Sequence, residues 1–157
     1  MTHHSVAFTS PSPDETARLA TRLGASLRAG DTLLLEGGIG AGKSHFARAL
    51  ILSRLAEPED VPSPTFTLVQ TYDLPECELW HADLYRLCDP DQIVELGLLD
   101  ATSTAICLIE WPDRMEDLTP PDALTLRLED PDKTDLRYIT LTWTDPKWSA
   151  RVKEAVK

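Results

Sequence analysis

A glycine-rich stretch between two apolar segments limits what this chain can fold into. The sequence LLLEGGIGAGKSHFARAL fits the pattern G-x-x-x-x-G-K-[ST], which begins at Gly37 and ends at Ser44. The apolar residues of Thr32–Glu36 before it predict a strand, and the helical spacing of apolar residues after it predicts a helix. A strand that leads through a glycine turn into a helix is typical of a phosphate-binding loop.

The residue types in this loop suit the phosphates of a nucleotide. Glycines let the backbone turn so that successive N–H groups face one anion, and the helix that begins near Lys43 adds free amides and the positive end of its dipole. The Lys43 ammonium can reach the β and γ phosphates, and the Ser44 hydroxyl can ligate magnesium. A glycine turn that binds nothing is the alternative, which four glycines around GKS disfavour. The expected nucleotide-binding residues of this segment are Gly37, Gly38, Ile39, Gly40, Ala41, Gly42, Lys43, Ser44 and His45.

Length and composition favour one domain that spans residues 1–157. Hydrophobic residues make up 42% and charged residues 26%, as in globular proteins. The start, MTHHSVAFTS, lacks the pattern of a signal peptide, and no segment reaches the roughly 20 apolar residues of a membrane span. We therefore expect a cytoplasmic protein without membrane association.

Cys77, Cys88 and Cys107 lack C-x-x-C spacing, so we expect reduced thiols, with Cys107 in the core.

The other segments predict a mixed central sheet flanked by helices. Residues 66–72 and 78–85 predict one antiparallel hairpin, and residues 124–128 and 138–143 predict another. Residues 6–8 predict an edge strand and residues 105–109 a strand covered on both faces. Further helices are predicted from the cap Ser12 to Gly30, from Asp89 to Gly97 and from Asp145 onward. The expected fold class is α/β, a single-domain P-loop NTPase-like fold with antiparallel hairpins.

Two carboxylates after the loop could complete the site, because a phosphate loop needs an acidic group to hold magnesium or orient water. Glu110 follows the continuous apolar run, which would deliver it to the edge of the sheet. Asp83 lies in the alternating sequence HADLY, where a solvent-facing hairpin carboxylate is the alternative. Ser44, Asp83 and Glu110 are the expected metal ligands.

Other side chains have less specific patterns. Thr65, in the proline-punctuated sequence VPSPTF, could reach a γ phosphate as switch loops do, or be an ordinary turn threonine. Trp111 could pack near the nucleotide or only against the proline that follows it. Arg137 could approach phosphate or be a solvated surface arginine. His45 and His81 lack metal-ligand spacing, so each is expected to be structural or to make a polar contact.

Together these motifs resemble the TsaE family, also called YjeE. The segments LEGGIGAGKS, SPTFTLVQTY, HADLYRL followed by ELGLLD, and CLIEWPDR are similar to that family's motifs in order and spacing, from Gly37 to Arg114. The resemblance implies a P-loop ATPase of bacterial tRNA threonylcarbamoyladenosine biosynthesis that binds ATP and Mg²⁺. It further implies docking on TsaB and TsaD proteins, where ATPase activity supports repeated modification beside the anticodon without transfer of the threonylcarbamoyl group.

By the same resemblance, Lys43, Thr65, Asp83 and Glu110 would be the catalytic residues, and Trp111 would lie on the nucleotide side with Glu110. The chain departs from the family pattern at Gly38-Ile39, at Ser44 and at His45. The last of these departures replaces a hydroxyl residue and weakens the case for a contact from position 45.

Two other functions fit a phosphate loop. A small-molecule kinase usually needs arginines in a lid, and the segment between the loop and Glu110 offers few, Arg54 and Arg86 among them. A nucleotide-gated binding module would bind ATP with negligible turnover.

The net charge of −11 disfavours direct contact with tRNA, which we expect only through partner subunits. The one place where the sequence allows a basic patch is the last helix, with Lys147, Arg151, Lys153 and Lys157; a solvated helix face is the alternative.

Overall fold

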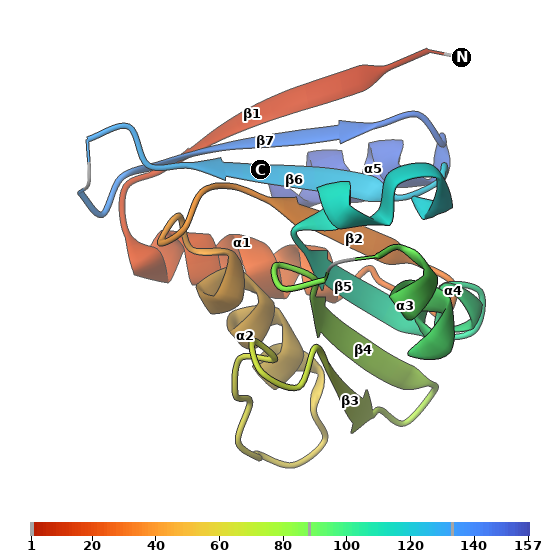
Figure 1. Cartoon of the computed structure of the whole chain (residues 1–157). Coiled ribbons are helices and arrows are strands. Elements are labelled where there is room, and N and C mark those ends of the chain that lie inside the picture. The colour runs from red at the N-terminus through yellow and green to blue at the C-terminus, as the bar shows by residue number, and fades with distance from the viewer. Residues whose placement is uncertain (1, 88, 133) are drawn as a thin grey trace.

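A computed structural model describes residues 2–87, 89–132 and 134–157, and it has one sheet of seven strands in the order β1-β7-β6-β2-β5-β4-β3 (Figure 1). The strands are β1 (His4–Ser10), β2 (Thr32–Glu36), β3 (Val69–Asp73), β4 (Glu78–Asp83), β5 (Ile106–Glu110), β6 (Leu124–Glu129) and β7 (Arg137–Trp143). The helices are α1 (Pro13–Gly24), α2 (Lys43–Arg54), α3 (Asp91–Glu95), α4 (Leu98–Ala101), the 3₁₀ segment η1 (Pro112–Leu118) and α5 (Lys147–Ala155). The expected α/β class with a mixed sheet is confirmed.

The centre of the sheet is parallel and its margins are antiparallel. Strands β4, β5, β2 and β6 run in one direction, whereas β3 pairs with β4, β7 with β6 and β1 with β7 in antiparallel fashion. Both predicted hairpins are therefore present, and β1 is an edge strand as predicted. Because β2, β5 and β4 end at the same edge, the phosphate loop, Glu110 and Asp83 meet there.

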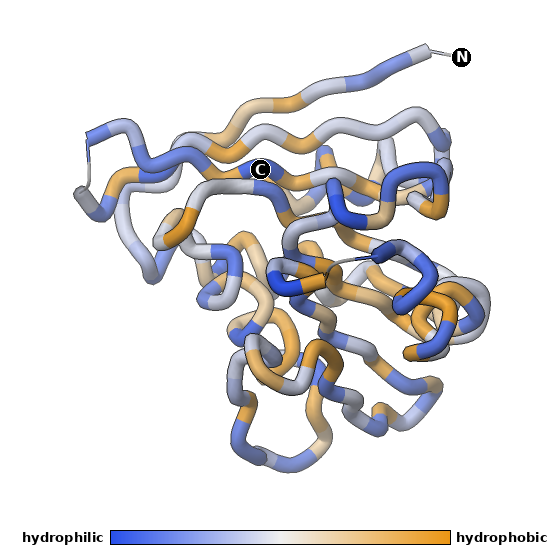
Figure 2. Tube along the Cα trace, in the orientation of Figure 1, coloured by the Kyte–Doolittle hydropathy of each residue, from blue (hydrophilic) through white to orange (hydrophobic). Residues whose placement is uncertain are grey.

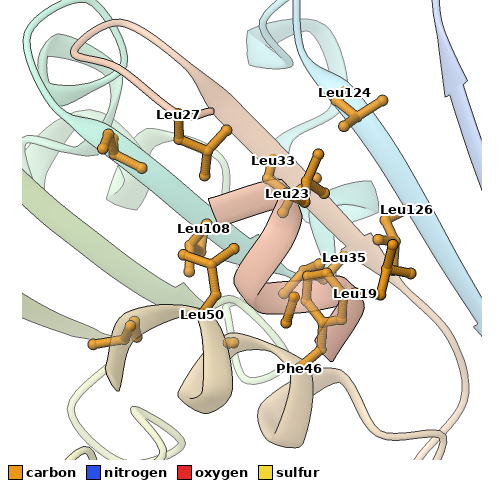
Figure 3. Close-up of a cluster of buried hydrophobic side chains, with 14 of the residues drawn as sticks. Leu19, Leu23, Leu27, Leu33, Leu35, Phe46, Leu50, Leu108, Leu124 and Leu126 are labelled. Carbon is orange, nitrogen blue, oxygen red and sulfur yellow. The ribbon is translucent and has the colours of Figure 1, made fainter. Parts of the chain in front are cut away.

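Two apolar cores lie on the two faces of the sheet. Alternation along β2 directs Leu33 and Leu35 to the core shared with α1, α2 and α5, and Leu34 to the core shared with α3, α4 and η1. Figure 3 shows part of the first core, where Phe46 lies near Leu19 and Leu35. Along β7 hydrophobic and polar residues alternate, as Figure 2 shows, because only one face of this strand is covered.

The prediction that the first helix continues to Gly30 is wrong. The helix α1 ends at Gly24, although Leu27 is still buried in the connection that follows. The Arg54 guanidinium, from the end of α2, donates to the carbonyl oxygens of Gly24 at 2.7 Å and Leu27 at 2.9 Å. These carbonyls therefore find partners outside a helical ladder, which the spacing of leucines could not reveal.

The first strand of the 66–85 hairpin begins later than predicted, at Val69, and its second strand ends at Asp83 instead of residue 85. Leu68 has a φ of 68°, and its N–H donates to the Pro64 carbonyl at 2.7 Å, so the chain turns there before pairing begins. Phe66 is 81% exposed in this turn.

The free thiols Cys77 and Cys107 agree with the expected absence of a disulfide at these two positions, and Cys107 is buried as predicted. Burial raises the pKa of the Cys107 thiol to about 12. The third cysteine, Cys88, lies outside the described residues. In the described part of the chain no helix has both the length and the apolar character needed to cross a membrane.

Candidate nucleotide-binding site

The loop between β2 and α2 has a backbone shape that only glycine fits at Gly37. Its φ is 148°, and a Cβ on this residue would lie 2.6 Å from the Leu128 carbonyl oxygen of β6. Gly42, at the N-cap of α2, has a φ of 109°, again in the region that glycine adopts without strain. The loop therefore lies close to β6, and this close approach requires glycine at position 37.

The N-terminus of α2 is left open for an anion. No side chain among the described residues caps it, and its first turn has no acidic residue. At α1, by contrast, the Ser12 side chain accepts a hydrogen bond from the Glu15 N–H, and Asp14 and Glu15 lie in the first turn. Free N–H groups and an uncompensated dipole at α2 are what phosphate binding requires.

A cleft of about 370 Å³ lies in front of this helix end. It brings together residues of the loop with Thr65, Asp83, Glu110 and Trp111, which are far apart in the sequence. It also contains Tyr85, which was not predicted from the sequence. The lining residues are Ile39, Gly40, Gly42, Lys43, Ser44, His45, Thr65, Asp83, Tyr85, Glu110 and Trp111.

A larger hollow of about 650 Å³ lies on the other side of Ile39, between the loop, η1 and the end of β6. Neither Lys43 nor Ser44 lines it, and its charged groups are Arg127 and four carboxylates. The smaller cleft is therefore the candidate phosphate site, because it contains the cation, the hydroxyl and the helix end. The four carboxylates of the larger hollow are Glu36, Asp113, Glu129 and Asp130.

Lys43 is folded back onto its own loop. Its Nζ donates to the carbonyl oxygens of Gly37 at 2.6 Å and Gly38 at 2.9 Å, and lies 4.2 Å from the centroid of the Trp111 ring. Burial lowers the pKa of Lys43, while the nearby Glu110 and Asp83 carboxylates oppose this shift. The lysine is thus a partly desolvated cation at the place where phosphates would supply negative charge.

Glu110 is buried and held from two elements. The Ser44 hydroxyl, at the start of α2, donates to its Oε1 at 3.1 Å and its Oε2 at 3.3 Å. From β4, the His81 Nε2 lies 2.6 Å from the same Oε2. Both the His81 and the Glu110 side chains are almost fully buried, at 2% and 3% exposure. The expected polar contact of His81 is confirmed, but its partner was not predicted.

Asp83 lies beside Glu110, because the parallel register pairs these two residues at the ends of β4 and β5. Its Oδ1 accepts the Tyr85 N–H at 3.0 Å, and its Oδ2 accepts the Thr65 hydroxyl at 3.4 Å. Asp83 is only 6% exposed, so the alternative of a solvent-facing hairpin carboxylate is wrong. Thr65 is connected to this carboxylate across the cleft.

Trp111 forms part of the wall of the cleft. Its φ of 58° turns the chain at the end of β5, and its ring centroid lies 4.8 Å from that of Tyr85. The alternative in which this tryptophan packs only against the following proline is therefore wrong.

Two residues predicted to contact the nucleotide have other partners. Arg137 Nε donates to the Ala41 carbonyl at 2.8 Å, and its guanidinium lies 3.5 Å from the Asp130 carboxylate. It supports the loop and is absent from the residues that line the cleft. The His45 ring Nε2 lies 3.0 Å from the Pro13 carbonyl oxygen of α1, so any contact from this position would come from its backbone. A direct contact of Arg137 with phosphate remains a prediction.

The oxygen atoms in the cleft suit a magnesium ion that arrives with a nucleotide. Within the described ranges, no group of three or more His, Cys, Asp or Glu side chains is placed to hold a metal on its own. Mg²⁺ is usually bound through one or two carboxylates together with waters and substrate phosphates. The Ser44 hydroxyl beside Glu110, with Asp83 adjacent, matches that incomplete set.

Comparison with known proteins identifies the family. Residues 10–139 match the model of the family described as threonylcarbamoyl adenosine biosynthesis protein TsaE. The chain belongs to the TsaE family. A tRNA threonylcarbamoyladenosine biosynthesis protein TsaE of Rickettsia bellii is 41% identical over 124 residues, which are 78% of this chain and 86% of that protein. The protein of the same name in Bacillus subtilis is 34% identical over 131 residues, 83% of this chain and 80% of its own.

A solved structure has the same fold. The crystal structure of YdiB from Bacillus subtilis superposes with a TM-score of 0.79 and 25% sequence identity, covering 99% of this chain and 96% of YdiB. The match includes both the parallel centre and the antiparallel margins of the sheet, since nearly the whole chain is aligned.

Proposed function

We propose that this protein binds and hydrolyses ATP in the cytoplasm as an accessory factor of tRNA N6-threonylcarbamoyladenosine modification next to the anticodon. We further propose that it acts on a complex of TsaB and TsaD and reaches tRNA only through them. The observation that carries the proposal is the open N-terminus of α2, with Lys43 and the Ser44–Glu110 pair placed around it. The names of its TsaE relatives support the pathway.

In this proposal the phosphates of ATP take the place of the loop's own carbonyls as partners of Lys43. The ammonium is already at the loop and already partly desolvated, so it needs only to exchange neutral acceptors for charged ones. Free N–H groups at the start of α2 bind the phosphate oxygens from the other side.

The carboxylates serve the metal and the attacking water. Ser44, Asp83 and Glu110 are the residues that would hold Mg²⁺, which supplies charge neutralisation at the phosphates. Glu110 and Asp83 would also orient the attacking water, and the Thr65 hydroxyl donates to Asp83 beside them. The Trp111 and Tyr85 rings form an apolar part of the cleft wall beside these groups.

One series of measurements tests the proposal. Phosphate release from ATP is measured with the protein alone, then with TsaB and TsaD, and then with a panel of small phosphate acceptors. We expect slow release by the protein alone and clear stimulation by the TsaB–TsaD complex. Lys43→Ala is the inactive control in each mixture.

Two results would contradict the proposed function and indicate another one. Phosphorylation of a small acceptor would indicate a kinase. Tight ATP binding without turnover in any mixture would indicate a nucleotide-gated binding module.

A further inference from the structure

The buried contact between His81 and Glu110 has no role in nucleotide binding as described so far. We propose that His81 is a positioning residue, which holds Oε2 of Glu110 so that its carboxylate faces Ser44 and the cleft in the orientation that ATP hydrolysis needs. This inference rests on the proposed ATPase function. It concerns a side chain that does not line the cleft itself.

The sheet explains why His81 can reach Glu110. Leu79, His81 and Asp83 alternate along β4 on the face that α2 covers, as Leu108 and Glu110 do on β5. The register pairs His81 with Leu108, so the imidazole extends along the sheet to the next residue on that face of β5. The histidine stands where the apolar core ends and the polar site begins.

An apolar residue at this position would continue the core formed by Leu79 and Leu108. A buried imidazole instead requires a hydrogen-bond partner, and the one it has is Glu110, at 2.6 Å. Its other ring nitrogen, Nδ1, is buried and has no hydrogen-bond partner in the described part of the chain. Among the described residues, only the hydrogen bond to Glu110 orients the ring, and the same bond restrains Glu110 in return.

The hydrogen-bond roles follow from the chemistry of the two groups. An ionised carboxylate only accepts hydrogen bonds, so Nε2 carries the hydrogen and donates to Oε2. The Ser44 hydroxyl is closer to Oε1 than to Oε2. His81 of the sheet thus holds Oε2, and Oε1 faces Ser44 at the start of α2. Loss of a hydrogen bond of this kind to a catalytic or ligating group commonly lowers activity by about tenfold or more.

Two substitutions separate positioning from simple filling of the core. His81→Leu fills much of the volume without a donor, whereas His81→Gln keeps an N–H donor on a side chain of suitable length. With the stimulated assay above, we expect His81→Leu to lower kcat by about 10- to 100-fold and His81→Gln to restore most of it. The affinity for ADP without Mg²⁺ should not change, because the phosphate loop is intact.

The matched control is Thr32→Val on β2. Thr32 is a buried polar residue of the same sheet whose hydroxyl has no partner among the described residues and does not contact Glu110. This variant should keep wild-type kcat. In a Glu110→Gln background, His81→Leu should cause no further loss, because the two residues act through one contact. A wild-type kcat in His81→Leu, equal losses in His81→Leu and His81→Gln, or a full additional loss in the double variant would overturn the inference.

A measurement without turnover tests the contact by itself. In the ligand-free protein with ¹⁵N-labelled histidine, His81 should show a proton bound to Nε2 that exchanges slowly with water, and this signal should be lost in Glu110→Ala. Its absence from the wild-type protein would overturn the inference even if His81→Leu does not fold. If the wild-type protein hydrolyses no ATP in any mixture but the signal is present, the proposed function fails and the contact stands. If the TsaB–TsaD complex stimulates hydrolysis and His81→Leu is fully active, only the positioning role fails.

Discussion

At the scale of single residues, the site holds two charged side chains against groups that a nucleotide would replace. Lys43 donates to carbonyl oxygens of its own loop, and Glu110 accepts the hydroxyl of Ser44. Neither charge is left buried without a partner, which would be costly. The partners of both charges can be exchanged for phosphate and Mg²⁺.

Replacement of Lys43 by alanine should weaken ATP binding and abolish turnover. The variant removes the cation that the loop directs at the phosphates, and the loss of a hydrogen bond to a charged group costs about 1.5 to 3 kcal/mol, or roughly 10- to 100-fold in affinity. Titration calorimetry with ATP measures the effect. Lys153→Ala on the exposed face of α5 is the control and should bind ATP as the wild-type protein does. An unchanged affinity in Lys43→Ala would contradict the role of this residue.

The affinity for ATP should fall as pH rises, beginning below the ordinary lysine pKa of 10.5. Burial lowers the pKa of Lys43 in the free protein, with Glu110 and Asp83 opposing the shift. Bound phosphates favour the charged ammonium, so the pKa is higher in the complex and binding takes up a proton. Affinity is then lost as pH passes through the lowered pKa of the free protein. A binding series between neutral and alkaline pH measures this, and Lys43→Ala should show a flatter profile.

Glu110→Gln should bind ATP but hydrolyse it slowly. The amide has nearly the shape of the carboxylate but lacks the charge that holds Mg²⁺ or polarises water. We expect kcat to fall roughly 100-fold or more, as for loss of a general base. Single-turnover hydrolysis and ATP titration separate the two effects. A wild-type rate of hydrolysis would reject the assigned role. Loss of ATP binding would indicate that the Glu110 carboxylate acts chiefly in binding the nucleotide.

At the scale of elements, the phosphate loop depends on its close approach to β6. Gly37→Ala would place a Cβ 2.6 Å from the Leu128 carbonyl, at a φ of 148°. We expect a loss of about 1 to 3 kcal/mol in the free energy of unfolding, together with weaker ADP binding. Gly38→Ala is the matched control, since a Cβ there meets nothing within 4 Å. Urea unfolding of both variants measures the difference. Equal stability would show that β6 shifts enough to accommodate the added Cβ.

The sequence was most informative where one segment determines its own structure. The strand β2, the glycine loop, the start of α2 and the carboxylate after a continuous apolar run were all predictable, because glycine spacing and apolar periodicity are local properties. The end of α1 was not, because the arginine that takes its last carbonyls comes from the end of α2. Likewise, nothing in HADLY indicates that His81 reaches Glu110, which requires the parallel register of β4 and β5.

At the scale of the whole molecule, Lys147 and Arg151 of α5 help to hold the fold together. Lys147 lies 3.2 Å from the Asp31 carboxylate and 3.0 Å from that of Asp122, and Arg151 Nη1 lies 2.7 Å from Asp31. At the end of the chain, Lys157 lies 2.9 Å from the carboxylate of Glu154. The contacts with Asp31 attach the last helix to the connection before β2, and the contact with Asp122 attaches it to the connection before β6. Together with the Lys157–Glu154 pair they leave little positive charge there for a nucleic acid.

The isolated protein should therefore bind tRNA weakly. Phosphate contacts supply most of the non-specific affinity by releasing counterions, which requires clustered basic residues. Here 15 basic residues are outnumbered by 26 acidic ones, and the cluster that the sequence allows is largely paired with carboxylates. Fluorescence polarisation with labelled tRNA at low salt, with and without TsaB and TsaD, measures the difference. We expect binding only in the presence of the partners. Tight, salt-sensitive binding by the protein alone, lost when Lys153 and Lys157 are replaced by glutamine, would show instead that α5 offers tRNA a surface of its own.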